Sequence, residues 1–128
     1  MNAAQILIPV SVGEIFDRIS ILKLKLRKLS DEAKLANVRY ELERLELIAE
    51  PFPLDGQPGE FMEALSDVNA GLWDIEDELR EMERRQDFSG NFVTAARQVY
   101  KLNDERFRLK SELSRAFGSE ISEEKSYC

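Results

Sequence analysis

The apolar residues of this chain recur at alternating spacings of three and four positions, which is typical of one buried helix face. The clearest stripe lies in the segment 60–86, where the spacing continues without a gap. Its members are Phe61, Leu65, Val68, Leu72, Ile75, Leu79 and Met82. Comparable stripes indicate three more helices, over about 12–29, 31–50 and 90–117. The pattern therefore predicts an all-α fold.

The first of these helices has a recognisable start and one competing interpretation. Ser11 and Glu14 fit a capping box, with the serine at the N-cap position. Residues 22–27 alternate apolar and basic positions, as a half-buried strand would. We favour a helix because Leu, Lys and Arg are good helix formers and the helical stripe is longer than the alternation. Leu24 then lies outside the stripe, where it either widens the buried face or contacts another subunit.

Turn-forming residues separate the stripes. The strongest break is 51–59, which holds three of the four prolines and two of the six glycines. Ser30 and Asp31 are suited to end one helix and cap the next, and 87–90 forms another turn. We therefore expect one helical domain, 1–128, in which two antiparallel hairpins form a four-helix bundle.

The two ends of the sequence do not follow the helical pattern. Residues 1–10 are predicted to be extended because Pro9 disfavours a helix at the residue before it. Their apolar side chains, among them Ile6, Leu7 and Ile8, are expected to be buried along the bundle or in a short strand. The segment 119–128 is polar, and we expect it to be at best partly ordered.

Composition narrows the chemistry that this chain can perform. The sequence has no histidine, and its single cysteine is Cys128. These counts exclude Ser-His-Asp and Cys-His catalysis, an intramolecular disulfide and the usual zinc ligand sets. No apolar run approaches the length of a membrane span, and we expect a cytoplasmic protein without a signal peptide. Carboxylate, arginine and magnesium chemistry remain.

Acidic residues outnumber basic ones, and the formal net charge is −7. The negative charge is concentrated in 51–88, whereas the segments 1–30 and 89–117 of the first and last predicted helices have a net positive charge. We favour complementary packing of the helices and solubility as the explanation of this distribution. The alternative is that the third predicted helix offers its carboxylates to a metal ion. The overall acidity argues against nucleic acid as a partner, because affinity for nucleic acid comes largely from neutralising phosphates.

Carboxylates at a spacing of three residues are candidates for a magnesium site. Glu14 and Asp17 lie on one side of the first helix, and Asp77 follows Asp74 by the same spacing on the third. Oxygen ligands of this kind suit Mg²⁺. The alternative is that Glu14 closes the capping box and that Asp17 favours the positive end of the helix.

Arg106 interrupts the apolar stripe of the last helix, so it needs a partner or a ligand. A hairpin that turns near residue 87 places Asn69 opposite Arg106 and Trp73 near Asn103. One interpretation is a pocket for phosphate or another anion, with Arg106 as the clamp and Trp73 as a wall. Its candidate ligand-binding residues are Arg18, Asn69, Trp73, Glu76, Asn103 and Arg106. The other interpretation is a contact of Arg106 with Glu76 or Asn69 that sets the helix register.

Several segments together resemble a known protein family. The segments are 8–14 with Asp17 and 21–22, then 33–39, 72–77, 99–100 with 103–106, and 118–127. They are similar to an uncharacterised bacterial family of short helical proteins, a domain of unknown function. The resemblance implies a bacterial origin and an association with genes for surface-polysaccharide synthesis or glycosyl transfer. It implies no catalytic residues.

Two functions follow as hypotheses. The first is a non-catalytic protein-binding or accessory module that acts as a homodimer and needs no cofactor. The second is a Mg²⁺-dependent enzyme or sensor for a phosphorylated or nucleotide-sugar ligand. In the second, Glu14, Asp17 and Asp77 hold the metal, and Arg18 and Arg106 hold the phosphate.

Overall fold

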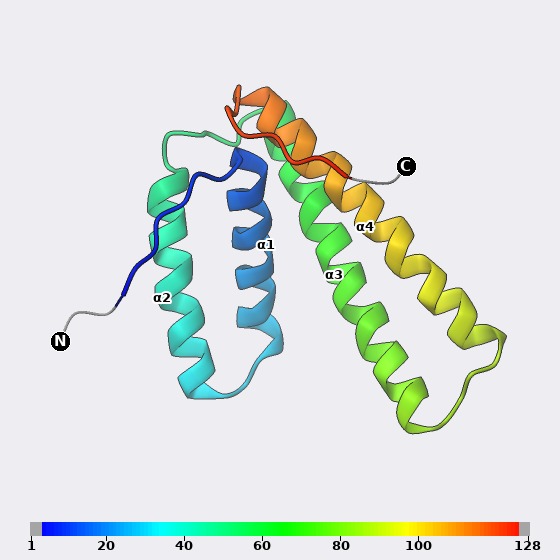
Figure 1. Cartoon of the computed structure of the whole chain (residues 1–128). Coiled ribbons are helices and arrows are strands. Elements are labelled where there is room, and N and C mark those ends of the chain that lie inside the picture. The colour runs from blue at the N-terminus through cyan, green and yellow to red at the C-terminus, as the bar shows by residue number, and fades with distance from the viewer. Residues whose placement is uncertain (1–3, 126–128) are drawn as a thin grey trace.

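The computed structural model describes residues 4–125 as two helical hairpins (Figure 1). The first hairpin pairs α1 (Val12–Lys28) with α2 (Glu32–Ala49), and the second pairs α3 (Gln57–Arg84) with α4 (Gly90–Ala116). No strand occurs within this part of the chain. The predicted all-α fold of two hairpins is confirmed. The parts of the two predicted end segments at 1–3 and 126–128, including Cys128, lie outside the described residues.

The helix starts follow the local chemistry of the chain. The Ser11 side chain accepts a hydrogen bond from the amide of Glu14, and Asp31 accepts one from the amide of Lys34. Both predicted N-cap residues are therefore present. The prediction that Glu14 closes a capping box is wrong, because its carboxylate binds Arg18 and Lys110 and not the Ser11 amide. α1, α2 and α4 end within a residue of the predicted limits, which is the usual uncertainty of a frayed helix end.

The third helix begins earlier than predicted. We expected it to start at about residue 60, after a break rich in proline and glycine, but α3 starts at Gln57. Gly56, with φ at 64°, turns the chain into the helix, and Pro58 lies in the first turn. A proline is tolerated there because amides of the first turn have no partner within the helix. The helix also ends at Arg84 and not at residue 86, because Gln86 adopts a left-handed conformation with φ at 57°.

α1 is the central helix of the fold. It packs against all three other helices, whereas α2 approaches α1 alone within the described chain. The hairpins meet at the N-terminal end of α1 and diverge toward their turns (Figure 1). The largest apolar cluster joins both hairpins and includes Phe16, Leu42, Leu65, Leu109 and Leu113. The bundle is therefore closed at one end and open at the other.

Leu24 is buried inside the protomer, with 3% of its surface exposed. Of its two predicted roles, the structure supports a widened buried face. Gly13, Asp17, Ser20 and Leu24 are all buried and follow a spacing of four, three and four residues. α1 therefore has a second buried stripe, which is largely polar.

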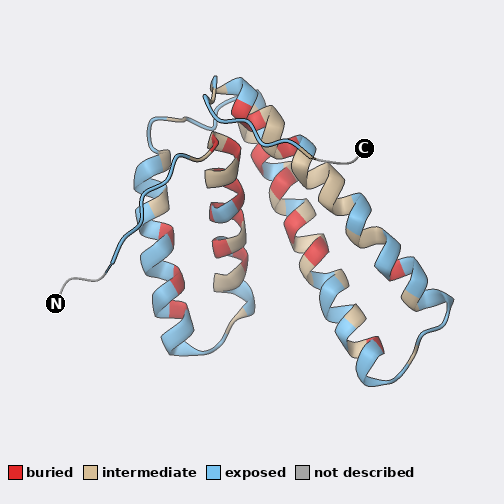
Figure 2. Ribbon diagram, viewed as in Figure 1, coloured by how far each residue is buried: buried red, intermediate tan, exposed pale blue. Residues whose placement is uncertain are grey.

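The N-terminal segment is extended as predicted, but the expected burial of its side chains is wrong. Ile6 and Leu7 are 85% and 84% exposed, and Ile8 is also exposed. The segment runs across α2, whose outer side is exposed to solvent (Figures 1 and 2). Because α2 packs on α1 alone, no further helix covers these side chains.

The tail makes more contacts than its polar sequence indicated. Residues 119–125 turn back along α4 (Figure 1). The side chain of Ser119 accepts a hydrogen bond from the amide of Val12, at 3.2 Å. Glu123 pairs with Lys110, and Lys125 pairs with Asp104. Residues 119–125 therefore contact both α1 and α4, while the expectation of a partly ordered tail stays a prediction.

No helix among the described residues combines the length and the apolar character that crossing a membrane requires.

The close approach of α1 to α4 requires a glycine at position 13. A side-chain carbon there would overlap the carbonyl oxygen of Lys110 and crowd the Ser114 hydroxyl. We expect Gly13→Ala to lower the free energy of unfolding by about 1–3 kcal/mol, as overpacking does. Urea denaturation followed by circular dichroism measures the change.

The matched control is Gly90→Ala, because no atom lies within 4 Å of a side-chain carbon built at Gly90. This variant should keep or slightly raise the stability, since alanine restricts the unfolded chain more than glycine does. An equal loss in both variants would show that close packing at Gly13 is not the cause.

Candidate functional site

A buried ion pair between Asp17 of α1 and Arg106 of α4 lies where the two hairpins meet. Nε and Nη2 of Arg106 donate to the two carboxylate oxygens of Asp17 at 2.9 and 2.6 Å. The Asp17 side chain is 1% exposed and that of Arg106 is 30% exposed. This two-point geometry is the strongest that an arginine and a carboxylate form.

The third helix contributes Asn69 to the same cluster. The Asn69 amide nitrogen donates to Asp17 at 3.0 Å and to the hydroxyl of Ser20 at 3.1 Å. Within the described chain, every buried side-chain nitrogen and oxygen atom has a hydrogen-bond partner. The cluster therefore ties α1, α3 and α4 together without leaving a buried side-chain nitrogen or oxygen atom unpaired.

Lys110 links this cluster to the surface. Its ammonium group lies 2.7 Å from Glu14, 3.2 Å from Glu123 and 4.0 Å from Asp17. Glu14 also accepts a hydrogen bond from Arg18 at 2.9 Å. The two carboxylates predicted to bind Mg²⁺ on α1 thus share a lysine of α4.

The ionisation of the cluster follows from these contacts. Burial alone would raise the pKa of Glu14, but hydrogen bonds from Lys110 and Arg18 outweigh it and lower the pKa to about 2. The hydrogen bonds to Asp17 raise the pKa of Arg106. Burial opposes the charge of Lys110, yet Glu14 and Glu123 raise the pKa of its ammonium group. These three groups are therefore charged at neutral pH.

The predicted ligand-binding residues do not all meet in this cluster. Asn69 and Arg106 do, and Asn103 lines a pocket beside Arg106. Arg18 is exposed on α1, and Glu76 is exposed beside Arg80 on α3. Trp73 is partly buried and lines none of the four pockets described on this part of the chain.

The predicted metal ligands are separated as well. Asp77 lies on the exposed side of α3, where it pairs with Arg80 at 3.3 Å. In residues 4–125, no group of three or more Asp, Glu, His or Cys side chains is arranged to hold a metal ion. The structure thus does not bring Asp77 to Glu14 and Asp17, whose nearest cations are Lys110 and Arg106, respectively.

The residue that sequence reasoning missed is the partner of Arg106. We predicted Glu76 or Asn69 for that role, whereas the partner is Asp17. The available signal was the second stripe of α1, in which Asp17 and Ser20 precede Leu24 at helical spacing. A carboxylate on a buried helix face requires a cation from a neighbouring helix.

A small pocket adjoins this cluster on α4. It has a volume of about 350 Å³ and is lined mainly by polar and charged residues. They include Tyr100, Asn103, Asp104, Arg106, Lys110 and Lys125. Arg106 and Lys110 thus belong both to the buried cluster and to an open surface.

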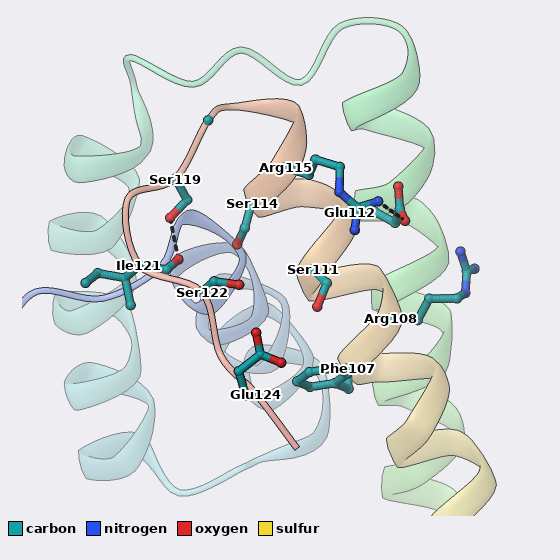
Figure 3. A pocket seen from close by; sticks show the side chains of 11 residues that line it. Phe107, Arg108, Ser111, Glu112, Ser114, Arg115, Ser119, Ile121, Ser122 and Glu124 are labelled. Atoms are coloured by element: carbon teal, nitrogen blue, oxygen red, sulfur yellow. Dashed lines mark hydrogen bonds and ion pairs between the residues drawn. The ribbon is translucent and has the colours of Figure 1, made fainter. Parts of the chain in front are cut away.

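A second pocket, of about 600 Å³, lies between α4 and the tail (Figure 3). Four serines contribute to it, but two of them serve the fold. The hydroxyls of Ser114 and Ser119 accept hydrogen bonds from the first amides of α1, those of Gly13 and Val12. The nearby Arg115 pairs with Glu112 at 2.9 Å. The arrangement satisfies the N-terminus of α1, and among the described residues neither carboxylate of this pocket, Glu112 or Glu124, forms a hydrogen bond with one of its serines.

The largest of the four pockets described on this part of the chain is an apolar groove of about 810 Å³ beside the N-terminal segment. One wall is formed by residues 4–12, and the other by α2 and Phe52, with Ile15 and Arg18 of α1 between them. Tyr40, Leu45 and Ile48 line the side formed by α2, together with Glu41 and Arg44. This groove has the apolar lining and the few charged groups typical of a binding surface.

The buried pair supports a stability prediction. Asp17→Asn leaves Arg106 without its carboxylate, and we expect the free energy of unfolding to fall by about 3–5 kcal/mol. Asp77→Asn is the matched control, because Asp77 is exposed and its pair with Arg80 should contribute less than about 1 kcal/mol. Urea titration of both variants measures the difference. Similar stabilities would contradict a central role for the pair.

The lowered pKa of Glu14 predicts a dependence on acid. The unfolded chain takes up a proton near the ordinary value of 4.5, while the folded chain does so only near 2. The contribution of Glu14 is therefore complete above pH 4.5 and is lost as the pH falls toward 2. Glu14→Gln should show a smaller decline of the urea midpoint across this interval than the wild type does. The same decline in both proteins would rule out Glu14 as a source.

The sequence and the fold were compared with known proteins. No curated protein matches the chain, and no solved structure does. The model of one protein family matches residues 6–128, nearly the whole chain, and agrees with the resemblance seen in the sequence. The chain belongs to this family of unknown function, DUF6165.

Proposed function

We propose that this chain is a non-catalytic protein-binding module whose partner is a second copy of itself. The observation that carries the proposal is the apolar groove beside the N-terminal segment, together with the exposed side chains at its edge. Ile6, Leu7 and Ile8 project from one wall, and Ile48 is exposed on the other. Clustered apolar surface of this kind marks an interaction site more often than isolated exposed residues do.

The shape of this surface favours a second copy. It carries apolar projections from the N-terminal segment next to a hollow lined by Val12, Ile15 and Leu45. In a two-fold dimer, each surface patch meets the same patch of the partner. The N-terminal segment of one protomer can therefore enter the groove of the other, and the exchange is reciprocal.

The charges at the groove are also complementary to a second copy of the same surface. The Arg44 guanidinium carbon lies 5.8 Å from the centre of the Tyr40 ring. Glu41 lies three residues before Arg44 on the same helix, α2. Neither Glu41 nor Arg44 forms an ion pair within residues 4–125. A two-fold axis near these residues would place the arginine of each copy against the glutamate of the other. A surface that carries both positive and negative charges is more complementary to a second copy of itself than to a strongly acidic or strongly basic partner.

The polar cluster supports the non-catalytic part of the proposal. Arg106 of α4 and Asn69 of α3 direct their side-chain hydrogen bonds to Asp17 and Ser20 of α1, and these bonds join three helices. A reacting group would need an accessible nucleophile or base held beside its substrate. The buried groups here have their partners inside the protein and are best explained as a structural joint.

A matched pair of substitutions on α2 tests the interface. Ile48 lines the groove and is 54% exposed, whereas the adjacent Leu47 is 65% exposed and does not line it. We expect a dimer for the wild type, a dimer for Leu47→Asp, and a monomer for Ile48→Asp at the same concentration. Burying an unpaired charge should weaken association by about 100-fold. Analytical ultracentrifugation at micromolar concentrations measures the constants.

Charge reversal identifies the occupant of the groove. Arg44→Glu should weaken the dimer, and adding Glu41→Arg should restore it if the two residues pair across the two-fold axis. A wild-type protein that stays monomeric at 100 times the tested concentration would refute self-association. Equal weakening by Leu47→Asp and Ile48→Asp would place the interface elsewhere. Circular dichroism of each variant confirms that the helices remain folded.

A further inference from the structure

The pocket of about 350 Å³ on α4 brings three cationic side chains together in an acidic protein. Three cations line it, Arg106, Lys110 and Lys125, against one carboxylate, Asp104. The chain as a whole carries a net charge of −7. Arg106 and Lys110 also pair with Asp17, Glu14 and Glu123, so the pocket offers their remaining N–H donors and not an excess of positive charge. From these donors and the arrangement of Arg106, we propose that the pocket binds a small oxyanion of the phosphate class.

Arg106 is held in a position that suits such a ligand. A guanidinium group has five N–H donors, and the bonds to Asp17 occupy Nε and Nη2. The side chain is 30% exposed and lines the pocket, so the donors that Asp17 does not use are accessible from there. The buried carboxylate fixes the guanidinium before the ligand arrives. An anion therefore does not have to immobilise a flexible side chain, and this preorganisation favours binding.

The other polar groups of the pocket complement this arginine. Asn103 lies three residues before Arg106 on α4, and its side-chain amide makes no hydrogen bond within residues 4–125. Lys110 reaches Glu14 and Glu123, while Lys125 pairs with Asp104 and lies 5.4 Å from the centre of a phenylalanine ring. An amide N–H and two ammonium groups beside a fixed guanidinium are donors that match the oxygens of a phosphate.

The pocket also limits the size of the ligand. Its volume lies at the lower end of the range for small-molecule sites. Tyr100 and Phe107 provide aromatic surface at its wall. The pocket accommodates either free phosphate or the phosphate group of a small monoester whose organic part lies against these rings.

Binding is measured on the full chain with inorganic phosphate as the probe. Calorimetry and ¹H–¹⁵N NMR are performed against a sodium chloride reference of equal ionic strength, because general screening also affects surface charges. We expect saturable binding, a higher melting temperature, and amide shifts centred on residues 99–110. A ligand that prefers the folded state raises its stability in this way. If neither inorganic phosphate nor the monoester adenosine monophosphate binds saturably, the proposal is overturned.

Two amide-to-acid substitutions on α4 separate the pocket from overall charge. Asn103→Asp introduces a negative charge into the pocket, and Asn91→Asp introduces the same charge at an exposed position outside it. We expect the dissociation constant to increase at least about tenfold for Asn103→Asp and less than about twofold for Asn91→Asp, since more distant exposed charges are screened. Equal weakening by both would overturn the site.

A second pair protects the test against loss of folding. Lys125→Gln removes a cation from the pocket, and Lys101→Gln removes one from the exposed side of α4. Only the first should weaken phosphate binding. A parallel titration with adenosine monophosphate distinguishes the source of the anion. Tighter binding than that of phosphate identifies a phosphate monoester, and weaker binding identifies the free ion.

Discussion

The buried carboxylate of Asp17 is the constraint on which the arrangement of the helices depends. An ionised group at this depth is stable only if cations and hydrogen-bond donors from other elements reach it. Arg106 comes from α4 and Asn69 from α3, so three helices must adopt one relative position. Apolar packing is tolerant of small shifts, whereas a two-point ion pair is not. The cluster thus specifies how the hairpins dock, and the apolar residues around it supply most of the driving force.

The open shape of the molecule is a consequence of docking at one end. The contacts between hairpins gather around Phe16, Leu65 and Leu113, while α2 touches α1 alone among the described helices. One side of α2 and the extended segment across it therefore remain accessible to a partner. The same joint leaves Arg106 partly exposed on the opposite hairpin. An apolar surface and a cationic pocket thus lie on different hairpins of one small domain.

The sequence predicted the helices well because their information is local. Stripe spacing, the caps at Ser11 and Asp31, and the break before α3 each depend on a few neighbouring residues. Pro58 misled the prediction because a proline ends one helix or opens another according to its position in the turn.

The pairing of Asn69 and Arg106 across the second hairpin was nearly correct, since both side chains converge on one group. That group, Asp17, could not be deduced from hairpin geometry because it belongs to the other hairpin. Burial of Ile6 and Leu7 was predicted from their side chains alone, but burial requires a covering surface.

The hydroxyls that complete the N-terminus of α1 have a consequence for the order of folding. The amides of Val12 and Gly13 donate to Ser119 and Ser114, which lie 107 and 101 residues away along the chain. Helices form within microseconds, but closing so long a loop carries an entropic cost that local contacts do not repay. On a ribosome, the first hairpin emerges long before the residues that cap and clamp it. Its apolar and charged faces stay exposed to solvent during that interval. The newly made hairpin therefore reaches its native packing and capping only after the last turns of α4 have been synthesised.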